Sequence, residues 1–261
     1  MKLFKIISLI VIIIFQFNSI ASADDQEIEV GIIEKLGEYI PLDLVFNDEN
    51  GDSIILRQLV NKPTILSFVY FRCPTICPRM LSDLSRLLEK IDLKPGPDFT
   101  LITISFDPTD TPQAAADKKM NFIASIQRTI PDSAWRFLTG DVNHIAEITE
   151  SVGYRFKKDG QDFIHPSALF FLAPDGKMVR YITGVSYLPF DVKLALIEAA
   201  EGRIGQSINR VLEYCFSYDP KGRTYALDIT KIMGTIILFL IGVFVVFLFI
   251  KTQARKRAMR Q

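Results

Sequence analysis

Residues 63–80 read PTILSFVYFRCPTICPRM, and this stretch decides the fold of the chain. Its first half, 63–71, is an unbroken apolar run rich in β-forming residues, which predicts a strand buried on both faces. From Pro78 onward the apolar residues recur at helical spacing, which predicts a helix with the proline in its first turn. Cys73 and Cys77 stand where the strand gives way to the helix, and each is followed by a proline.

Strands and helices alternate along the rest of the chain. Apolar runs predict strands at 99–106, 135–139 and 168–172, and a turn at 174–176 leads into a hairpin partner at 177–183. Apolar periodicity predicts helices at 112–128, 142–152 and 188–203. This order of elements indicates an α/β fold with a mixed central sheet flanked by helices.

The first 23 residues have the pattern of a secretory signal peptide. Lys2 and Lys5 precede an apolar run at residues 6–15, and the small residues at 21–23 form a cleavage pattern. The run is short for a membrane span. We therefore expect cleavage after Ala23 and export of the chain.

The other end predicts a membrane anchor. Residues 232–250 are 19 consecutive residues without a charge. As a helix they would span about 28 Å, close to the ~30 Å hydrocarbon core. The tail at 251–261 has five basic residues and no acidic one, which places it in the cytoplasm. We expect one C-terminal transmembrane helix in the inner (plasma) membrane, with the domain 24–203 facing the periplasm and 204–231 as a connector.

The balance of charges differs between these regions. The chain has 30 basic and 30 acidic residues, but two basic residues lie in the signal peptide and five in the tail. Residues 24–231 therefore combine 23 basic with 30 acidic side chains. Nucleic-acid binding needs a basic face, so we expect no nucleic-acid partner. The same 208 residues are enough for one domain with its own core.

Cys73 and Cys77 allow three interpretations: a structural disulfide, a redox pair, or two metal ligands. A disulfide persists in an oxidising compartment, but a bridge between these two residues closes a short loop and stabilises little. A helix start lowers thiol pKa values, because its free N–H groups and positive dipole end favour the thiolate. The thiolate is both the redox nucleophile and a soft metal ligand, so the last two interpretations stay open.

A metal site needs more than two thiolates, and the chain has two histidines. His144 lies near a predicted helix start, which favours a surface or capping role. His165 precedes the predicted strand 168–172, and sites in α/β proteins gather at strand ends. Its peptide bond to Pro166 is of a type that can be cis. We predict His165 as the third ligand of a soft set that fits copper, especially Cu(I). Cys215, in the connector, is a poor fourth ligand.

Four stretches carry a resemblance to a known family: YFRCPTICP (70–78), LITISFDPTDTP (101–112), LTGDVNHIAEITESVGYRF (138–156) and IHPSALFFLAPDGK (164–177). They resemble the Sco/SenC proteins, and the similarity covers the chain from about Gly31 to Gly205. The resemblance implies a thioredoxin-like fold. It also implies that the family's ligands for copper, as Cu(I) and also Cu(II), are Cys73, Cys77 and His165 in this chain.

The resemblance also implies a function. The expected role is a membrane-anchored metallochaperone that assists assembly of the copper centre of cytochrome c oxidase. Its partners would be the copper-bearing oxidase subunit, other copper chaperones and thiol reductants. The alternative is a thiol–disulfide oxidoreductase in which Cys73 and Cys77 keep the copper-site cysteines of the oxidase reduced.

Two features set this chain apart within the resemblance. The C-terminal anchor and CFSYDP (215–220) resemble a bacterial branch of the family. SFDPTDTP (105–112) is shorter than the family's usual aspartate-rich segment and lacks its basic residue. Asp107 in this segment is expected either to orient the site or to form a turn at a strand end.

Overall fold

The computed structural model describes residues 30–205, the strands at 216–219 and 224–227, and single positions between 233 and 251. The predicted signal peptide and Cys215 lie outside the described residues.

The predicted anchor falls largely in the same undescribed part. Most of the span 232–250 and the tail beyond Lys251 are not described. Within the described residues, no helix is both long enough and apolar enough to cross a membrane. The predicted connector contains two strands, β12 (Phe216–Asp219) and β13 (Thr224–Leu227), which pair antiparallel.

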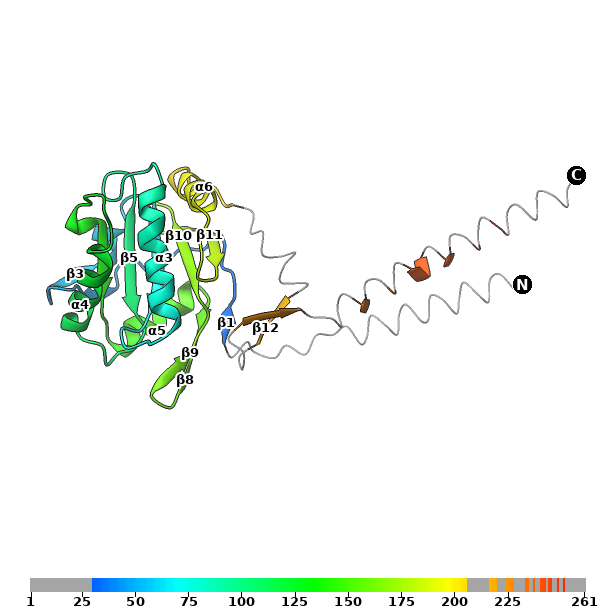
Figure 1. Ribbon diagram of the computed structural model, residues 1–261, viewed down its shortest axis with the longest axis horizontal. Coiled ribbons are helices and arrows are strands. Elements are labelled where there is room, and N and C mark those ends of the chain that lie inside the picture. The colour runs from blue at the N-terminus through cyan, green and yellow to red at the C-terminus, as the bar shows by residue number, and fades with distance from the viewer. Residues whose placement is uncertain are drawn as a thin grey trace, which may run out of the picture.

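A five-stranded mixed sheet forms the centre of the fold (Figure 1). In spatial order its strands are β11 (Met178–Thr183), β10 (Ala168–Leu172), β4 (Thr64–Val69), β5 (Thr100–Ser105) and β6 (Trp135–Leu138). β4, β5 and β6 are parallel, whereas β10 runs antiparallel to both β4 and β11. The end of β4 therefore lies beside the start of β10.

Helices flank this sheet (Figure 1). They are α2 (Leu56–Leu59), α3 (Ile76–Lys90), α4 (Pro112–Ile123), α5 (Val142–Ser151) and α6 (Pro189–Ala200), with a short 3-10 helix at Asp132–Ala134. The apolar stripe of α3 is buried as its spacing predicts: Met80, Leu81, Leu84, Leu87 and Leu88 all face the core. All six residues of β4 and all six of β5 are buried, which confirms two central strands.

Short strands add small two-stranded sheets that the sequence did not predict. They are β1 (Gly31–Ile32) with β7 (Tyr154–Arg155), β2 (Val45–Asn47) with β3 (Ser53–Ile55), and β8 (Lys157–Asp159) with β9 (Asp162–Ile164). The β8–β9 hairpin projects from the body of the fold (Figure 1). Strands of two or three residues are too short to show a periodic pattern, which explains why they were missed.

The predicted ends of three helices need correction. α3 begins two residues before Pro78, so Cys77 lies inside its first turn. α4 ends at Ile123 rather than 128: the Ser125 and Ile126 N–H groups bond to carbonyls three residues back instead of four, which tightens and ends the helix. Arg128, predicted to lie in this helix, instead donates to carbonyl oxygens at the C-terminal end of α3.

The third helix is α6, which ends at Ala200 rather than 203. Gly202 follows with a positive φ of 61°, a conformation that terminates helices.

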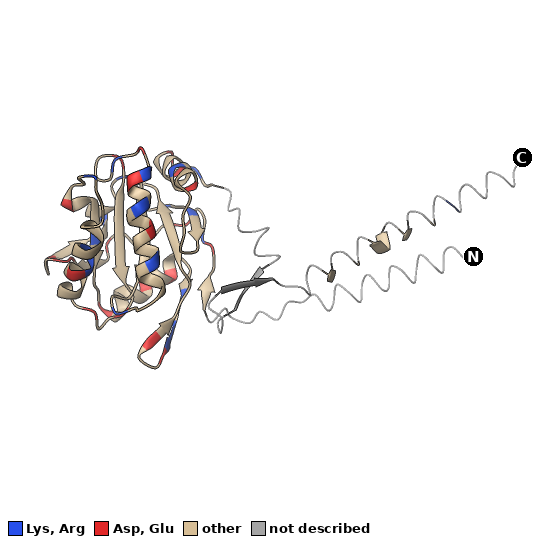
Figure 2. Cartoon of the chain, viewed as in Figure 1, with Lys and Arg blue, Asp and Glu red and all other residues tan. Residues whose placement is uncertain are grey.

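The described residues contain no cis peptide bond, so the His165–Pro166 bond is trans and the suggested cis turn is wrong. Figure 2 shows Lys and Arg interspersed with Asp and Glu along the described elements.

Candidate metal centre

The fold brings the three predicted ligands together where β4 ends and β10 begins. Cys73 lies in the loop after β4, Cys77 in the first turn of α3, and His165 between β9 and β10. Because β4 and β10 are antiparallel neighbours, the loop after the first faces the segment before the second. One ligand atom from each residue lies within 4.8 Å of the others, and all three side chains are buried. The arrangement could hold a metal ion.

The two thiols are free and have different environments. The Cys77 backbone N–H points at Cys73 Sγ, 3.5 Å away, so the sulfur caps the helix start in place of a usual capping side chain. Hydrogen bonding with Cys77 outweighs burial and lowers the pKa of Cys73. Burial, followed by the interaction with Cys73, raises the pKa of Cys77 well above its ordinary value. Cys73 is therefore the thiolate of the pair.

His165 is oriented by hydrogen bonds on its outer nitrogen. Its Nδ1 lies 2.9 Å from the Pro166 carbonyl oxygen and 3.0 Å from the Tyr154 hydroxyl. Tyr154 in turn donates to the same carbonyl at 3.0 Å. A carbonyl only accepts, so this network fits a proton on Nδ1. Nε2 then carries a lone pair, and it lies 3.7 Å from Cys77 Sγ. The second nitrogen is thus aimed at the thiols as a ligand.

Aromatic rings surround the histidine. The ring centroids of Phe106 and Tyr70 lie 5.1 and 5.7 Å from that of His165. Tyr70 also contacts Phe163 of the β8–β9 hairpin, and its hydroxyl donates to Asp162 at 3.2 Å. These rings exclude water from the ligands, which strengthens electrostatic interactions inside the site.

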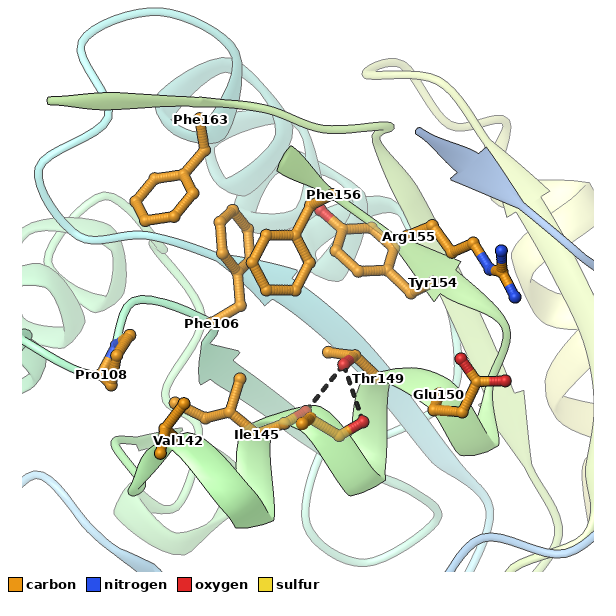
Figure 3. Close-up of a pocket in the computed structure, with 11 residues that line it drawn as sticks. Phe106, Pro108, Val142, Ile145, Thr149, Glu150, Tyr154, Arg155, Phe156 and Phe163 are labelled. Carbon is orange, nitrogen blue, oxygen red and sulfur yellow. Dashed lines mark hydrogen bonds between the residues drawn. The ribbon is translucent and has the colours of Figure 1, made fainter. Parts of the chain in front are cut away.

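A small enclosed space borders the ligands. Six residues line it: Tyr70, Cys73, Thr75, Ile76, Phe163 and His165. A wider apolar groove of about 570 Å³ lies on the other side of Phe106 and Phe163. Figure 3 shows the rings of Tyr154 and Phe156 beside Phe106, across from residues of α5. The groove shares its aromatic wall with the site but contains none of the three ligands.

The other sequence candidates lie away from the ligands. The Asp107 carboxylate accepts from the backbone and hydroxyl of Thr109, which is the turn expected at the end of β5. It also accepts from the Arg72 guanidinium, and this connects it to the cysteine loop. His144 lies in the first turn of α5 next to Asp141, the capping residue, which confirms the expected position.

Sequence reasoning missed three supporting residues, namely Arg72, Asp110 and Tyr154. Arg72 stands next to Cys73, and Asp110 stands three residues after Asp107, so both lay inside the quoted motifs. Their contacts join segments 35 and 39 positions apart, and no local pattern reveals such pairs. Tyr154 lies 11 positions before His165, across a hairpin that was not predicted.

The donor set indicates a soft metal. Two thiol sulfurs and an imidazole nitrogen suit Cu(I) or zinc rather than calcium or magnesium, which prefer oxygen. A structural zinc site takes four protein ligands, whereas this cluster of described residues has three. The residues therefore fit copper.

Comparisons with known proteins agree with this geometry. The chain is similar to the SCO1 protein homolog of Bacillus subtilis, 28% identical over 162 residues, or 59% of this chain and 79% of that protein. The structure of BsSco has a TM-score of 0.51 at 26% identity and matches 65% of this chain and 98% of the other. That protein is described as having a disulfide switch and as a member of the Sco family of cytochrome c oxidase assembly proteins.

The fold itself is shared with a protein that binds copper. Arabidopsis thaliana ScoI, solved with copper bound, gives a TM-score of 0.51 at 22% identity over 64% of this chain and 99% of that one. At this identity the likeness concerns the fold alone. The sequence profile described as SCO1/SenC matches residues 38–189, more than half of the 261 residues. The chain therefore belongs to the SCO1/SenC family.

Proposed function

We propose that this protein is a copper metallochaperone that binds copper through Cys73, Cys77 and His165 and assists assembly of the copper centre of cytochrome c oxidase. One observation carries the proposal: three soft ligand atoms from distant parts of the chain lie within 4.8 Å of one another in a buried site. Membership of the SCO1/SenC family supports the oxidase as the recipient. Copper is the cargo, not a permanent cofactor.

The chain's own residues suit a site that loads and releases an ion. Cys73 already favours the thiolate, so it offers a charged ligand at neutral pH. Cys77 holds its proton until the metal binds, because burial disfavours its charge. Tyr154 holds the imidazole in the tautomer that presents Nε2.

The test is copper stoichiometry and X-ray absorption on the reduced protein. We expect one copper with two sulfur ligands and one nitrogen ligand, and loss of the nitrogen in His165→Ala. His144→Ala is the matched control, since it removes the chain's other histidine from a position near the surface. The proposal fails if the reduced protein retains no copper against a moderate chelator, or if both variants behave alike.

The asymmetry of the two thiols favours a second function, thiol–disulfide exchange. The Cys73 thiolate would attack a partner disulfide, and Cys77 would resolve the mixed disulfide. The partner gains two thiols, this chain gains a Cys73–Cys77 disulfide, and an external thiol reductant restores it. Normal exchange in His165→Ala together with loss in Cys73→Ser would favour this function over copper delivery.

We further propose that the domain faces the periplasm and is anchored through 232–250. An uncharged run followed by a basic tail supports this orientation. Fusion of a periplasm-dependent reporter enzyme after residue 205 should give activity, whereas fusion at the C-terminus should not. Carbonate extraction should leave the full chain in the membrane fraction and release a chain that ends before 232. The reverse reporter pattern would contradict this orientation.

A further inference from the structure

The segment after β5 holds the loop that carries Cys73 through two carboxylates. Asp110 accepts a hydrogen bond from the Phe71 backbone N–H at 2.7 Å and one from the Ser105 hydroxyl at 2.6 Å. Asp107 accepts from the Arg72 guanidinium. The two residues directly before Cys73 are thus each attached to the same turn.

Arg72 is placed between the two carboxylates. Its Nη2 bonds to Asp107 and lies 3.2 Å from the Thr109 hydroxyl, while its Nε lies 3.8 Å from Asp110 Oδ1. The side chains of Asp107 and Asp110 are only 3% and 2% exposed, whereas that of Arg72 is 58% exposed. One exposed cation therefore lies beside two buried carboxyl groups. The segment 105–112 contains no lysine or arginine of its own, so the cation comes from the cysteine loop.

A guanidinium suits this position because of its shape. Its planar fork can meet two acceptors at once, whereas a lysine ammonium is a point charge on a flexible stem. Removing the fork leaves two buried carboxylates without this cation and frees one of the two attachments of the loop. The loop would then sample positions in which Cys73 Sγ lies away from Cys77 and His165.

We propose that Arg72 is a positioning residue for the metal site: its hydrogen bond to Asp107 and its ion pair with Asp110 hold the Cys73 loop in the ligand geometry before copper arrives. The proposal rests on the copper-binding function proposed above. It assigns to Arg72 no contact with the metal. A preorganised site spends less of its binding free energy on ordering the loop, so the contribution of Arg72 is to affinity.

The test compares Cu(I) affinity, by competition with a chelator, in wild type and four variants. Arg72→Ala is expected to weaken binding by about tenfold, the lower end for residues that orient metal ligands. Arg72→Lys keeps the charge without the fork, and we expect it to stay closer to alanine than to wild type. Arg57→Ala is the matched control, because Arg57 is 59% exposed and pairs with the surface residue Asp43. It should bind as wild type does.

The fourth variant tests the route of the effect. If Arg72 acts through Asp107, then Arg72→Ala combined with Asp107→Asn loses little more affinity than Arg72→Ala alone. A clearly larger loss in the double variant than in Arg72→Ala would overturn this route, and full recovery by Arg72→Lys would overturn the role of the fork. Wild-type affinity in Arg72→Ala would overturn the proposal as a whole.

A second readout separates this proposal from the proposed function. Cys73 is 3% exposed, and in metal-free protein a released loop should react several-fold faster with a thiol reagent. The rates are compared in wild type, Arg72→Ala and Arg57→Ala after equal folding is checked by thermal melting. If wild type binds no copper, the proposed function fails, but faster modification of Arg72→Ala still supports the positioning role. An unchanged rate contradicts that role whether or not copper binds.

Discussion

His165 Nε2 lies 3.7 Å from Cys77 Sγ, although 88 positions of sequence separate the two residues. The contact exists because β10, which follows His165, pairs with β4, which leads into the cysteines. Tyr154 holds the other nitrogen of the ring, with its hydroxyl 3.0 Å from Nδ1. Three segments must be in place before the ligand set is complete, so the site depends on the whole fold.

Tyr154→Phe should weaken Cu(I) binding by about tenfold, because the imidazole loses a partner that fixes its tautomer and orientation. The protein should remain folded, since the ring keeps its stacking on Phe68 at 5.0 Å between centroids. Chelator competition measures the affinity. Tyr181→Phe is the control, because its hydroxyl also bonds to backbone groups, at Lys35 and Val152, but away from the metal site. Equal affinities in wild type and Tyr154→Phe would contradict the orienting role.

Cu(I) affinity should rise with pH. Burial raises the pKa of Cys77, so the metal-free protein keeps that proton at neutral pH, whereas the lowered pKa of Cys73 means that its proton has already left. Binding then releases one proton from Cys77. For one proton, affinity increases about tenfold per pH unit below the Cys77 pKa and levels off above it. Chelator competition over a series of neutral to alkaline pH values checks this slope. A slope of zero or of two protons would contradict the assignment.

The central strands and helices were predictable because each has a strong local signal. The unbroken apolar run of β4 and the stripe of α3 each agree with burial in the structure. The three ligands were also predictable, since Cys73 and Cys77 follow a central strand and His165 precedes another. Two thiols need a soft third ligand to form a metal site, and the chain offers only two histidines for that role.

The support of the site was not predictable, because it consists of contacts between segments. Arg72 meets Asp107 across 35 positions, and Tyr154 meets His165 across a hairpin of three-residue strands. The same limitation affected helix ends: Arg128 continues an amphipathic pattern, but its side chain donates to a carbonyl oxygen of another helix. Local periodicity predicts elements, whereas only the tertiary structure shows how one element caps or holds another.

Asp107→Asn should lose stability at neutral pH and little at acid pH. Burial opposes ionisation of Asp107, but hydrogen bonds from Thr109 and the pair with Arg72 outweigh it and lower its pKa. A depressed carboxyl pKa stabilises the native state above the unfolded value of about 4, and this contribution is lost as pH falls through the folded value. We expect a loss of about 1–3 kcal/mol near pH 7, the range for a buried group that loses a partner.

Denaturant unfolding of wild type and Asp107→Asn measures this difference, once near neutral pH and once near the lowered pKa of the Asp107 carboxyl. Asp43→Asn is the control, because Asp43 also pairs with an arginine but is 82% exposed at its side chain. Its effect should be close to zero at both pH values. An Asp107→Asn difference that stays constant down to acid pH would show that the residue acts through shape and not through its charge.

Gly153→Ala should be far more damaging than Gly160→Ala, although the two glycines have φ values of 66° and 64°. Any side chain at such an angle costs about 1–2 kcal/mol. A Cβ at Gly160 meets nothing within 4 Å, so this variant should lose no more than that. A Cβ at Gly153 would lie 1.8 Å from the Ile33 carbonyl oxygen, on backbone that cannot turn aside as a side chain would.

The clash at Gly153 reaches the metal site by a short path. Ile33 donates to the Gly153 carbonyl at 2.8 Å, next to the pairing of β1 with β7, and β7 begins with Tyr154. Displacing this backbone should move the hydroxyl that holds His165, so Gly153→Ala should lose both stability and Cu(I) affinity. Gly160 lies at the tip of the β8–β9 hairpin, so Gly160→Ala should keep its Cu(I) affinity. Unfolding free energies and chelator competition on both variants measure the two effects, and equal losses in the pair would contradict the steric argument.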